Sequence, residues 1–175
     1  SIQYKYMETK NIKYPYLPEG RKIEYVDSSN KFIKQAKEIA RTSNDQSFPT
    51  GALIVENEQV LVEASNKTPL SNPFLKNLHK KHCIRRMFGV PSGQKYWLCP
   101  GCASHENHGE YRASAILLKK FPQKVDANLD LYLWGHWWCC KPCWDKMLEA
   151  GIKRVFLLQG SEVLFDINNP GNIMG

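Results

Sequence analysis

Two short stretches of the chain carry side chains that bind metal ions and transfer protons. SHENHGEYRASAI contains His108 and Glu110 directly before an apolar pattern typical of a helix. CCKPCWDKMLEAGI contains Cys140 and Cys143 on either side of a proline, which is typical of a first helical turn. The exposed N–H groups and the positive dipole end of a helix start favour thiolate and carboxylate groups. Both pairs therefore stand where such groups are stabilised.

The donor types indicate a zinc site with an open position. If neighbouring strands deliver the two helix starts side by side, the imidazole of His108 and the thiolates of Cys140 and Cys143 can hold Zn²⁺ and leave a fourth position for water. Zinc lowers the pKa of such a water from its high value in bulk solvent towards about 7. Glu110, two residues from His108, is then placed to transfer a proton from that water to a leaving group. We therefore expect these three ligands to hold a catalytic zinc ion beside Glu110.

A second metal site is indicated by CPGCASH, which precedes His108. It contains a C-x2-C-x2-H pattern, and a further cysteine in HKKHCIRR is the expected fourth ligand, with His82 or His79 as its substitutes. The predicted set is Cys83, Cys99, Cys102 and His105. Three cysteines and one histidine would close a tetrahedral site without a vacancy, as structural zinc requires. Free cysteines or a disulfide between neighbours are the alternatives.

The H-x-E motif followed by C-x-x-C resembles that of the zinc-dependent nucleobase deaminases. PTGALIVENEQVLVEASN and CCKPCWDKMLEAGIKRVFLL are similar to the first hairpin and to the second zinc helix of the cytidine and deoxycytidylate deaminase superfamily, and the resemblance covers about 31–158. It implies Glu110 as the proton shuttle, Asn66 as a contact for the sugar, and a dimer or larger homo-oligomer. Gly109 and Cys139 depart from the family, which usually has Ala or Val and Pro there.

Further residues are candidates for substrate binding. Trp137 and Trp138, in the long GHWW loop, could stack on a base, with ordinary burial as the alternative. Arg112 lies close to the motif, and a basic cluster occurs in the preceding segment at Lys80, Lys81, Arg85 and Arg86. These cations are candidates for binding a phosphate group.

Periodicity and turn residues predict the elements. Helices are expected within 28–43, over 79–88, from about 111 to the proline at 122 and over 144–150, and strands over 51–55, 59–65, 129–134, 154–159 and 163–165. We expect an α/β fold with three layers, α/β/α, around a central mixed sheet of about five strands. The organisation would be an N-terminal extension over 1–25 and a deaminase domain over 26–175, with a zinc-binding insertion at about 67–105.

Composition is consistent with this organisation. The chain has 175 residues, 42% of them hydrophobic, which suits one folded domain. Its net charge of +7 favours anionic partners. C-x-x-C pairs near histidines are typical of metal sites in a reducing compartment, so we expect a cytoplasmic protein. No stretch has the ~20 apolar residues of a membrane span, so no membrane partner is expected.

The sequence thus predicts a zinc-dependent hydrolytic deaminase of a cytosine-type nucleotide, similar to deoxycytidylate. One alternative substrate is a base within RNA or DNA, and another is a modified base or nucleoside. An alternative of a different class is a zinc-ribbon interaction module, in which CPGC and CKPC share one metal ion.

Overall fold

A mixed five-stranded sheet forms the centre of the protein. The computed structural model describes residues 15–174. The strands are β1 (Lys22–Val26), β2 (Gly51–Glu56), β3 (Gln59–Ser65), β4 (Leu129–Trp134) and β5 (Ile152–Leu158). Their order in the sheet is β1-β5-β4-β2-β3, with β1, β5 and β4 parallel and β2 antiparallel to both β4 and β3. The expected mixed sheet of about five strands is confirmed.

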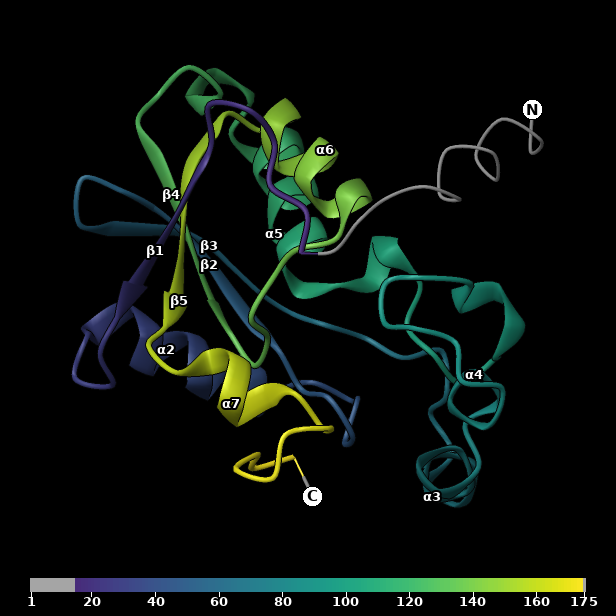
Figure 1. Cartoon of the computed structure of the whole chain (residues 1–175). Coiled ribbons are helices and arrows are strands. Elements are labelled where there is room, and N and C mark those ends of the chain that lie inside the picture. The colour runs from purple at the N-terminus through teal and green to yellow at the C-terminus, as the bar shows by residue number, and fades with distance from the viewer. Residues whose placement is uncertain (1–14, 175) are drawn as a thin grey trace.

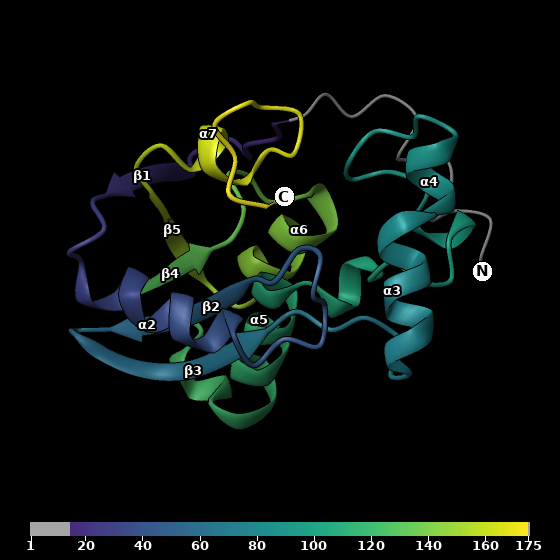
Figure 2. The same ribbon diagram turned by 90° about the horizontal axis from the view of Figure 1, so that it is seen from below.

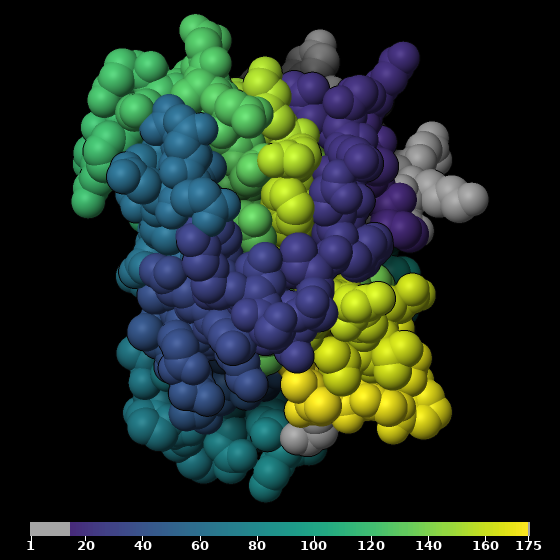
Figure 3. Space-filling view, turned by 90° about the vertical axis from the view of Figure 1, so that its left-hand side faces the viewer, coloured from purple at the N-terminus to yellow at the C-terminus, as the bar shows by residue number. Residues whose placement is uncertain are grey.

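Helices cover both faces of this sheet (Figure 1). On one face lie α2 (Lys31–Ala40) and the short α7 (Ser161–Phe165), and on the other lie α5 (Gly109–Lys120) and α6 (Lys141–Glu149). In Figure 3, the C-terminal residues beyond β5 lie beside the residues of α2 on the outer surface. The three-layer α/β/α architecture predicted from the sequence is confirmed.

The alternation of side chains along the inner strands explains the two hydrophobic layers. Leu53 and Val55 of β2 pack with α2 on one face, whereas Ala52 and Ile54 belong to the core beneath α5 and α6. All four side chains are buried, so β2 has no polar face. The core beneath α5 and α6 is the larger one and contains the fully buried Trp144 of α6. This core also contains Cys140 and Cys143, two of the ligands predicted for the catalytic zinc ion.

The segment between β3 and α5 forms a separate lobe to one side of the sheet, as Figures 1 and 2 show. It contains α3 (Pro73–Lys81), α4 (Ile84–Met87) and the 3-10 turns η2 (Tyr96–Leu98) and η3 (His105–Asn107). The single helix expected over 79–88 is two helices, because the chain leaves the helical conformation at His82 and Cys83. The Asn72 side chain caps α3, which begins with Pro73 at its first turn.

Two expectations about secondary structure are wrong. Residues 22–25, which were assigned to an N-terminal extension, form β1 with Val26 and pair in parallel with β5. Residues 163–165, expected as a strand, belong to α7, where Phe165 is buried against Ile33 and Leu158. Residues 1–14 of the expected extension lie outside the described part of the chain. Within 15–174, no helix has the length and apolar character needed to cross a membrane.

The close approach of β2 to α2 generates a prediction about stability. A Cβ atom at Gly51 would lie 2.0 Å from the Ala36 carbonyl oxygen, so Gly51→Ala must push the strand and the helix apart. We expect a loss of about 1–3 kcal/mol in the free energy of unfolding, measured by urea denaturation. The matched change Gly171→Ala should cost much less, because its Cβ would meet a methyl group of the exposed Val163 side chain. Equal losses would contradict this view of Gly51.

Candidate active site

The starts of α5 and α6 meet on one face of the sheet. His108 is the residue that precedes α5, and Cys140 is the residue that precedes α6. Nδ1 of His108 lies 3.4 Å from Sγ of Cys143 and 3.7 Å from Sγ of Cys140, and the two sulfur atoms are 3.0 Å apart. Both cysteines are buried and neither forms a disulfide. The convergence of helix starts predicted from the two motifs is therefore present.

The three donor atoms fit a zinc ion. Tetrahedral bonds of about 2.3 Å to sulfur and about 2.1 Å to nitrogen place nitrogen and sulfur about 3.6 Å apart and two sulfur atoms about 3.8 Å apart. The two distances from His108 match this value, while the two sulfur atoms lie closer together than zinc would hold them. One imidazole and two thiols are the donors that zinc prefers, and three of them leave one position open.

The thiol of Cys140 is in surroundings that favour its anionic form. Burial opposes ionisation, but contacts with Cys143, His105 and His108 outweigh it and hold the pKa of Cys140 well below the usual value for a thiol. Burial instead raises the pKa of Cys143 well above that value. At least one sulfur atom of the site is thus prepared to act as a thiolate ligand.

Glu110 lies in the first turn of α5 and is 5% exposed. One of its carboxylate oxygens is within 4.8 Å of a ring nitrogen of His108 and of Sγ of Cys143. Burial raises the pKa of this carboxyl group above its ordinary value. A carboxyl group that is enclosed beside the metal donors can take up a proton and release it again.

His105 lies at this site and not at the second cluster, contrary to the expected ligand set. Its Nδ1 is 3.1 Å from Sγ of Cys140, and its ring packs edge-on against those of Tyr96 and His108, with centroids 4.9 Å and 5.6 Å away. The 3-10 turn that begins at His105 directs its ring towards α6. The three donors of the C-x2-C-x2-H motif are therefore divided between two groups in this structure.

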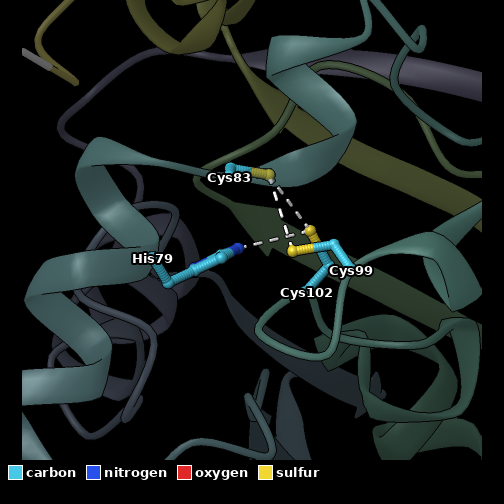
Figure 4. A group of neighbouring side chains, drawn as sticks. All are labelled: His79, Cys83, Cys99 and Cys102. Carbon is cyan, nitrogen blue, oxygen red and sulfur yellow. Dashed lines mark hydrogen bonds between the residues drawn. The ribbon is translucent and has the colours of Figure 1, made fainter.

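The second cluster consists of His79, Cys83, Cys99 and Cys102 (Figure 4), whose donor atoms all lie within 4.8 Å of one another. His79 thus occupies the place expected for His105. The pairs CPGC and CKPC belong to different groups of donors, so the structure does not support the zinc-ribbon alternative, in which they would share one ion.

Asn66, the expected sugar contact, is buried and engaged with the loop before β2. Its Oδ1 accepts from Thr50 N at 2.9 Å and from Ser43 Oγ at 2.6 Å, and its Nδ2 donates to Phe48 O at 2.8 Å. Since these bonds join the end of β3 to the start of β2, the side chain has a structural task in this conformation. A contact between Asn66 and a sugar stays a prediction.

The remaining expected substrate contacts are only partly available. Arg112 donates to the backbone oxygen of Ser65. Trp138 is 6% exposed and belongs to the core, whereas Trp137 is partly exposed and stacks on His136 with ring centroids 4.5 Å apart. Burial is therefore the better interpretation of Trp138, and Trp137 is the candidate that stays accessible.

Two residues near the site were not singled out from the sequence. The buried hydroxyl of Thr50 has no hydrogen-bond partner within 15–174, and a Cβ atom at Gly109 would lie 3.1 Å from it. His136 is half-buried next to His108, and burial lowers the pKa of its imidazole to about 4, so this ring is neutral at pH 7. The only sequence feature that could have identified these residues is their position next to a predicted strand. Thr50 directly precedes GALIV, and His136 follows LDLYLW.

The bonds of Asn66 lead to a prediction. Asn66→Ala removes the acceptor of Thr50 N and the donor to Phe48 O, so buried backbone groups lose their partners. We expect the free energy of unfolding to fall by about 1–3 kcal/mol in urea denaturation. Asn77→Ala, at an exposed position of α3, is the control and should stay within about 0.5 kcal/mol of the wild type. Unchanged stability of Asn66→Ala would show that its side chain is dispensable for the fold.

The chain was compared with curated proteins, solved structures and protein families. A search of curated proteins finds no significant match. Among solved structures, the chain is similar to dCMP deaminase from the cyanophage S-TIM5, both in apo form (19% identity, TM-score 0.44, 74% of this chain and 82% of that chain) and in complex with dCMP and dUMP (18% identity, TM-score 0.45, 73% and 79%). It is also similar to guanine deaminase from Bacillus subtilis (17% identity, TM-score 0.39, 75% and 64%).

The comparison with family profiles covers most of the chain. The cytidine and deoxycytidylate deaminase zinc-binding region matches residues 26–159, which include β2 to β5, α5, α6 and both groups of donors. The chain therefore belongs to the cytidine and deoxycytidylate deaminase zinc-binding family.

Proposed function

We propose that this protein is a zinc-dependent hydrolytic deaminase that acts on the amino group of a cytosine-type nucleotide, similar to deoxycytidylate. The observation that carries the proposal is the convergence of one imidazole nitrogen and two sulfur atoms from separate helix starts, next to an enclosed carboxyl group. His108, Cys140 and Cys143 would hold the zinc ion, and Glu110 would transfer protons.

The reaction needs a nucleophile and a group that carries protons. When bound, zinc lowers the pKa of a water molecule to about 7, which makes hydroxide available at neutral pH. Glu110 would take up one proton of the attacking water and deliver it to the ring nitrogen, and it would then transfer the remaining proton of the added hydroxyl group to the amino group. The bond from the ring carbon to oxygen forms, the bond to the amino nitrogen breaks, and ammonia leaves.

Backbone contacts position the residues that do this work. The backbone N–H of Lys67 donates to the carbonyl of Asn107 at 2.9 Å, which ties the turn before His108 to the end of β3. The N–H of His108 donates to the carbonyl of His105 at 3.1 Å and so closes that turn. His108 and Glu110 are therefore presented by a braced turn and a helix start, an arrangement that suits a preorganised site.

The role of Glu110 can be tested by Glu110→Gln. Glutamine keeps the size of the side chain but cannot carry the proton, so we expect folding and zinc content to stay and ammonia release to fall at least ~100-fold. Zinc content is measured by elemental analysis, folding by circular dichroism, and ammonia by a coupled assay. The control Glu106→Gln changes an exposed carboxyl group in the preceding turn and should retain turnover. Undiminished ammonia release by Glu110→Gln would refute the assigned role.

A phosphate site is the part of the proposal that distinguishes a nucleotide from a nucleoside. A cavity of about 140 Å³ is lined by the loop residues 44–47, by Thr68 and by α3, which contributes Lys76 and Lys80. Asn44 forms two hydrogen bonds with the backbone of Thr68, so the cavity borders the chain that leaves Asn66. Of the four basic candidates in the insertion, Lys80 alone lines this cavity, and Arg85 is buried elsewhere.

This assignment predicts a selective effect of Lys80→Gln. We expect KM for deoxycytidylate to rise about 10–100-fold, since a charge-assisted contact contributes about 1.5–3 kcal/mol, while turnover of deoxycytidine is unchanged. Lys81→Gln alters the adjacent exposed lysine, which does not line the cavity, and serves as the matched control. Equal effects of the two changes, or turnover of single-stranded oligonucleotides and of no monomer, would contradict a phosphate site at Lys80.

A further inference from the structure

The four donors of the second cluster come from three separate places in the insertion. His79 is in the last turn of α3, Cys83 precedes α4, and Cys99 and Cys102 belong to the CPGC turn. Sγ of Cys102 lies 3.5 Å from Nε2 of His79 and 3.6 Å from Sγ of Cys83, and the sulfur atoms of Cys83 and Cys99 are 3.9 Å apart (Figure 4). Tetrahedral zinc holds nitrogen and sulfur about 3.6 Å apart and two sulfur atoms about 3.8 Å apart, so all three distances fit.

The backbone of the CPGC turn packs closely against the ring of His79. A Cβ atom at Gly101 would lie 2.4 Å from the ring of His79, so only glycine allows the turn to approach the ring this closely. The hydroxyl of Thr68 donates to the carbonyl of Gly101 at 2.7 Å and fixes the turn from the other side. The alternative histidine in the same stretch, His82, is exposed and is not part of the group.

A buried cation beside the cluster indicates that the cluster is anionic. Arg85 is 8% exposed, and its guanidinium donates to the carbonyls of Gln94 and Pro91 and to Sγ of Cys102 at 3.6 Å. Within residues 15–174, no carboxylate forms an ion pair with Arg85. An enclosed charge without an opposite charge is strongly unfavourable, so this arginine needs an anion next to it.

Metal binding supplies that anion. Three thiolates, one neutral imidazole and one Zn²⁺ carry a net charge of −1, whereas three thiols and one neutral imidazole carry none. The sulfur of Cys102 is both a member of the cluster and the only sulfur that accepts from Arg85 among the described contacts. The single positive charge of the guanidinium therefore balances the loaded cluster.

We propose that His79, Cys83, Cys99 and Cys102 bind a second zinc ion, whose negative charge Arg85 balances. The four donors leave no position open for water, so the ion has a structural role. The site shares no ligand with the proposed active site, and the proposal therefore stands or falls separately from the deaminase activity.

The second centre also supports one wall of the active site. The guanidinium of Arg85 lies over the ring of Tyr96, 4.1 Å from its centroid. The other contacts of that ring are edge-on, with His105 at 4.9 Å and with His108 at 5.2 Å between centroids. A continuous chain of packed side chains thus leads from Cys102 to His108. Zinc in the insertion would hold Arg85 in place and, through Tyr96, the turn that carries His108.

Metal stoichiometry tests the second site. The purified wild-type chain should hold two zinc ions, and the pair Cys140→Ser with Cys143→Ser should hold one, because the insertion keeps its ion. The pair Cys83→Ser with Cys99→Ser should also hold one, and that ion should be lost to a chelator faster than the active-site ion of the wild type. A single ion in the wild type that survives Cys83→Ser with Cys99→Ser would overturn the proposal and leave the deaminase site intact.

Three histidine variants identify the nitrogen ligand. In the background of Cys140→Ser with Cys143→Ser, His79→Ala should abolish retention of the remaining ion, while His82→Ala and His105→Ala should retain it. Loss of the ion in His105→Ala and retention in His79→Ala would overturn this ligand set. If a cysteine pair fails to fold, chelator titration of the wild type decides the number of sites, since two releasable zinc ions support the proposal and one overturns it.

Arg85→Met tests the charge balance, with Arg41→Met as the control. The guanidinium of Arg41 is exposed and forms an ion pair with Glu38 of α2, so its loss does not change the charge beside the cluster. We expect Arg85→Met to weaken retention of one of the two ions about 10–100-fold and Arg41→Met to behave as the wild type. Equal retention by the two variants would show that Arg85 does not balance this site.

Discussion

The order of the strands constrains everything at the active site. β2 lies next to β4 and antiparallel to it, so Gly51 at the start of β2 pairs with Trp134 at the end of β4 and with Ser65 at the end of β3. The loops that follow β3 and β4 and the loop that precedes β2 therefore share one edge of the sheet. The helix starts that carry the metal donors meet because α5 and α6 pack against each other on the face beside this edge.

The backbone segments at this edge of the sheet pack so closely that some loop positions have room only for glycine. Gly135 has φ +101°, and a Cβ atom there would lie 2.3 Å from the carbonyl oxygen of Pro49. The loop between β4 and α6 consequently lies directly on the chain that enters β2. Close packing of this kind gives the donors of α6 a fixed distance from Glu110 and His108, which loose loops could not provide.

The parts of the site that could be predicted from the sequence are those fixed by local structure. The residues at helix starts are His108, Glu110, Cys140 and Cys143. A helix start can be recognised in a sequence because a proline and polar residues are followed by apolar residues at helical spacing. The ligands of the second cluster are harder to predict from the sequence, because they come from a segment with little periodicity. Whether His79, His82 or His105 meets the three cysteines depends on the break between α3 and α4 and on the CPGC turn, neither of which has a local signal strong enough to orient a side chain.

The same distinction applies to the fold. The strands β2, β4 and β5 have long runs of apolar residues, and their prediction was correct. β1 was missed because KIEYV is short, has only two half-buried apolar positions in Ile23 and Val26, and follows a proline and a glycine. Residues 163–165 form an apolar run of three, which fits a strand or a helical turn equally well. Burial of Phe165 against α2 favours the helix. Because this is a tertiary contact, the local sequence does not reveal it.

The charges of the two donor groups explain why they suit different tasks. One imidazole and two thiolates neutralise a divalent ion, so the group at α5 and α6 needs no cation nearby, and Arg112, close to it in the sequence, bonds instead to a carbonyl. At the proposed active site, a neutral centre with an open position would leave a bound water as the one group that can lose a proton, as hydrolysis requires. At the proposed second centre, a third thiolate would close the coordination and add one negative charge. The buried guanidinium of Arg85 would balance that charge, and it also stacks on Tyr96, whose ring contacts His108.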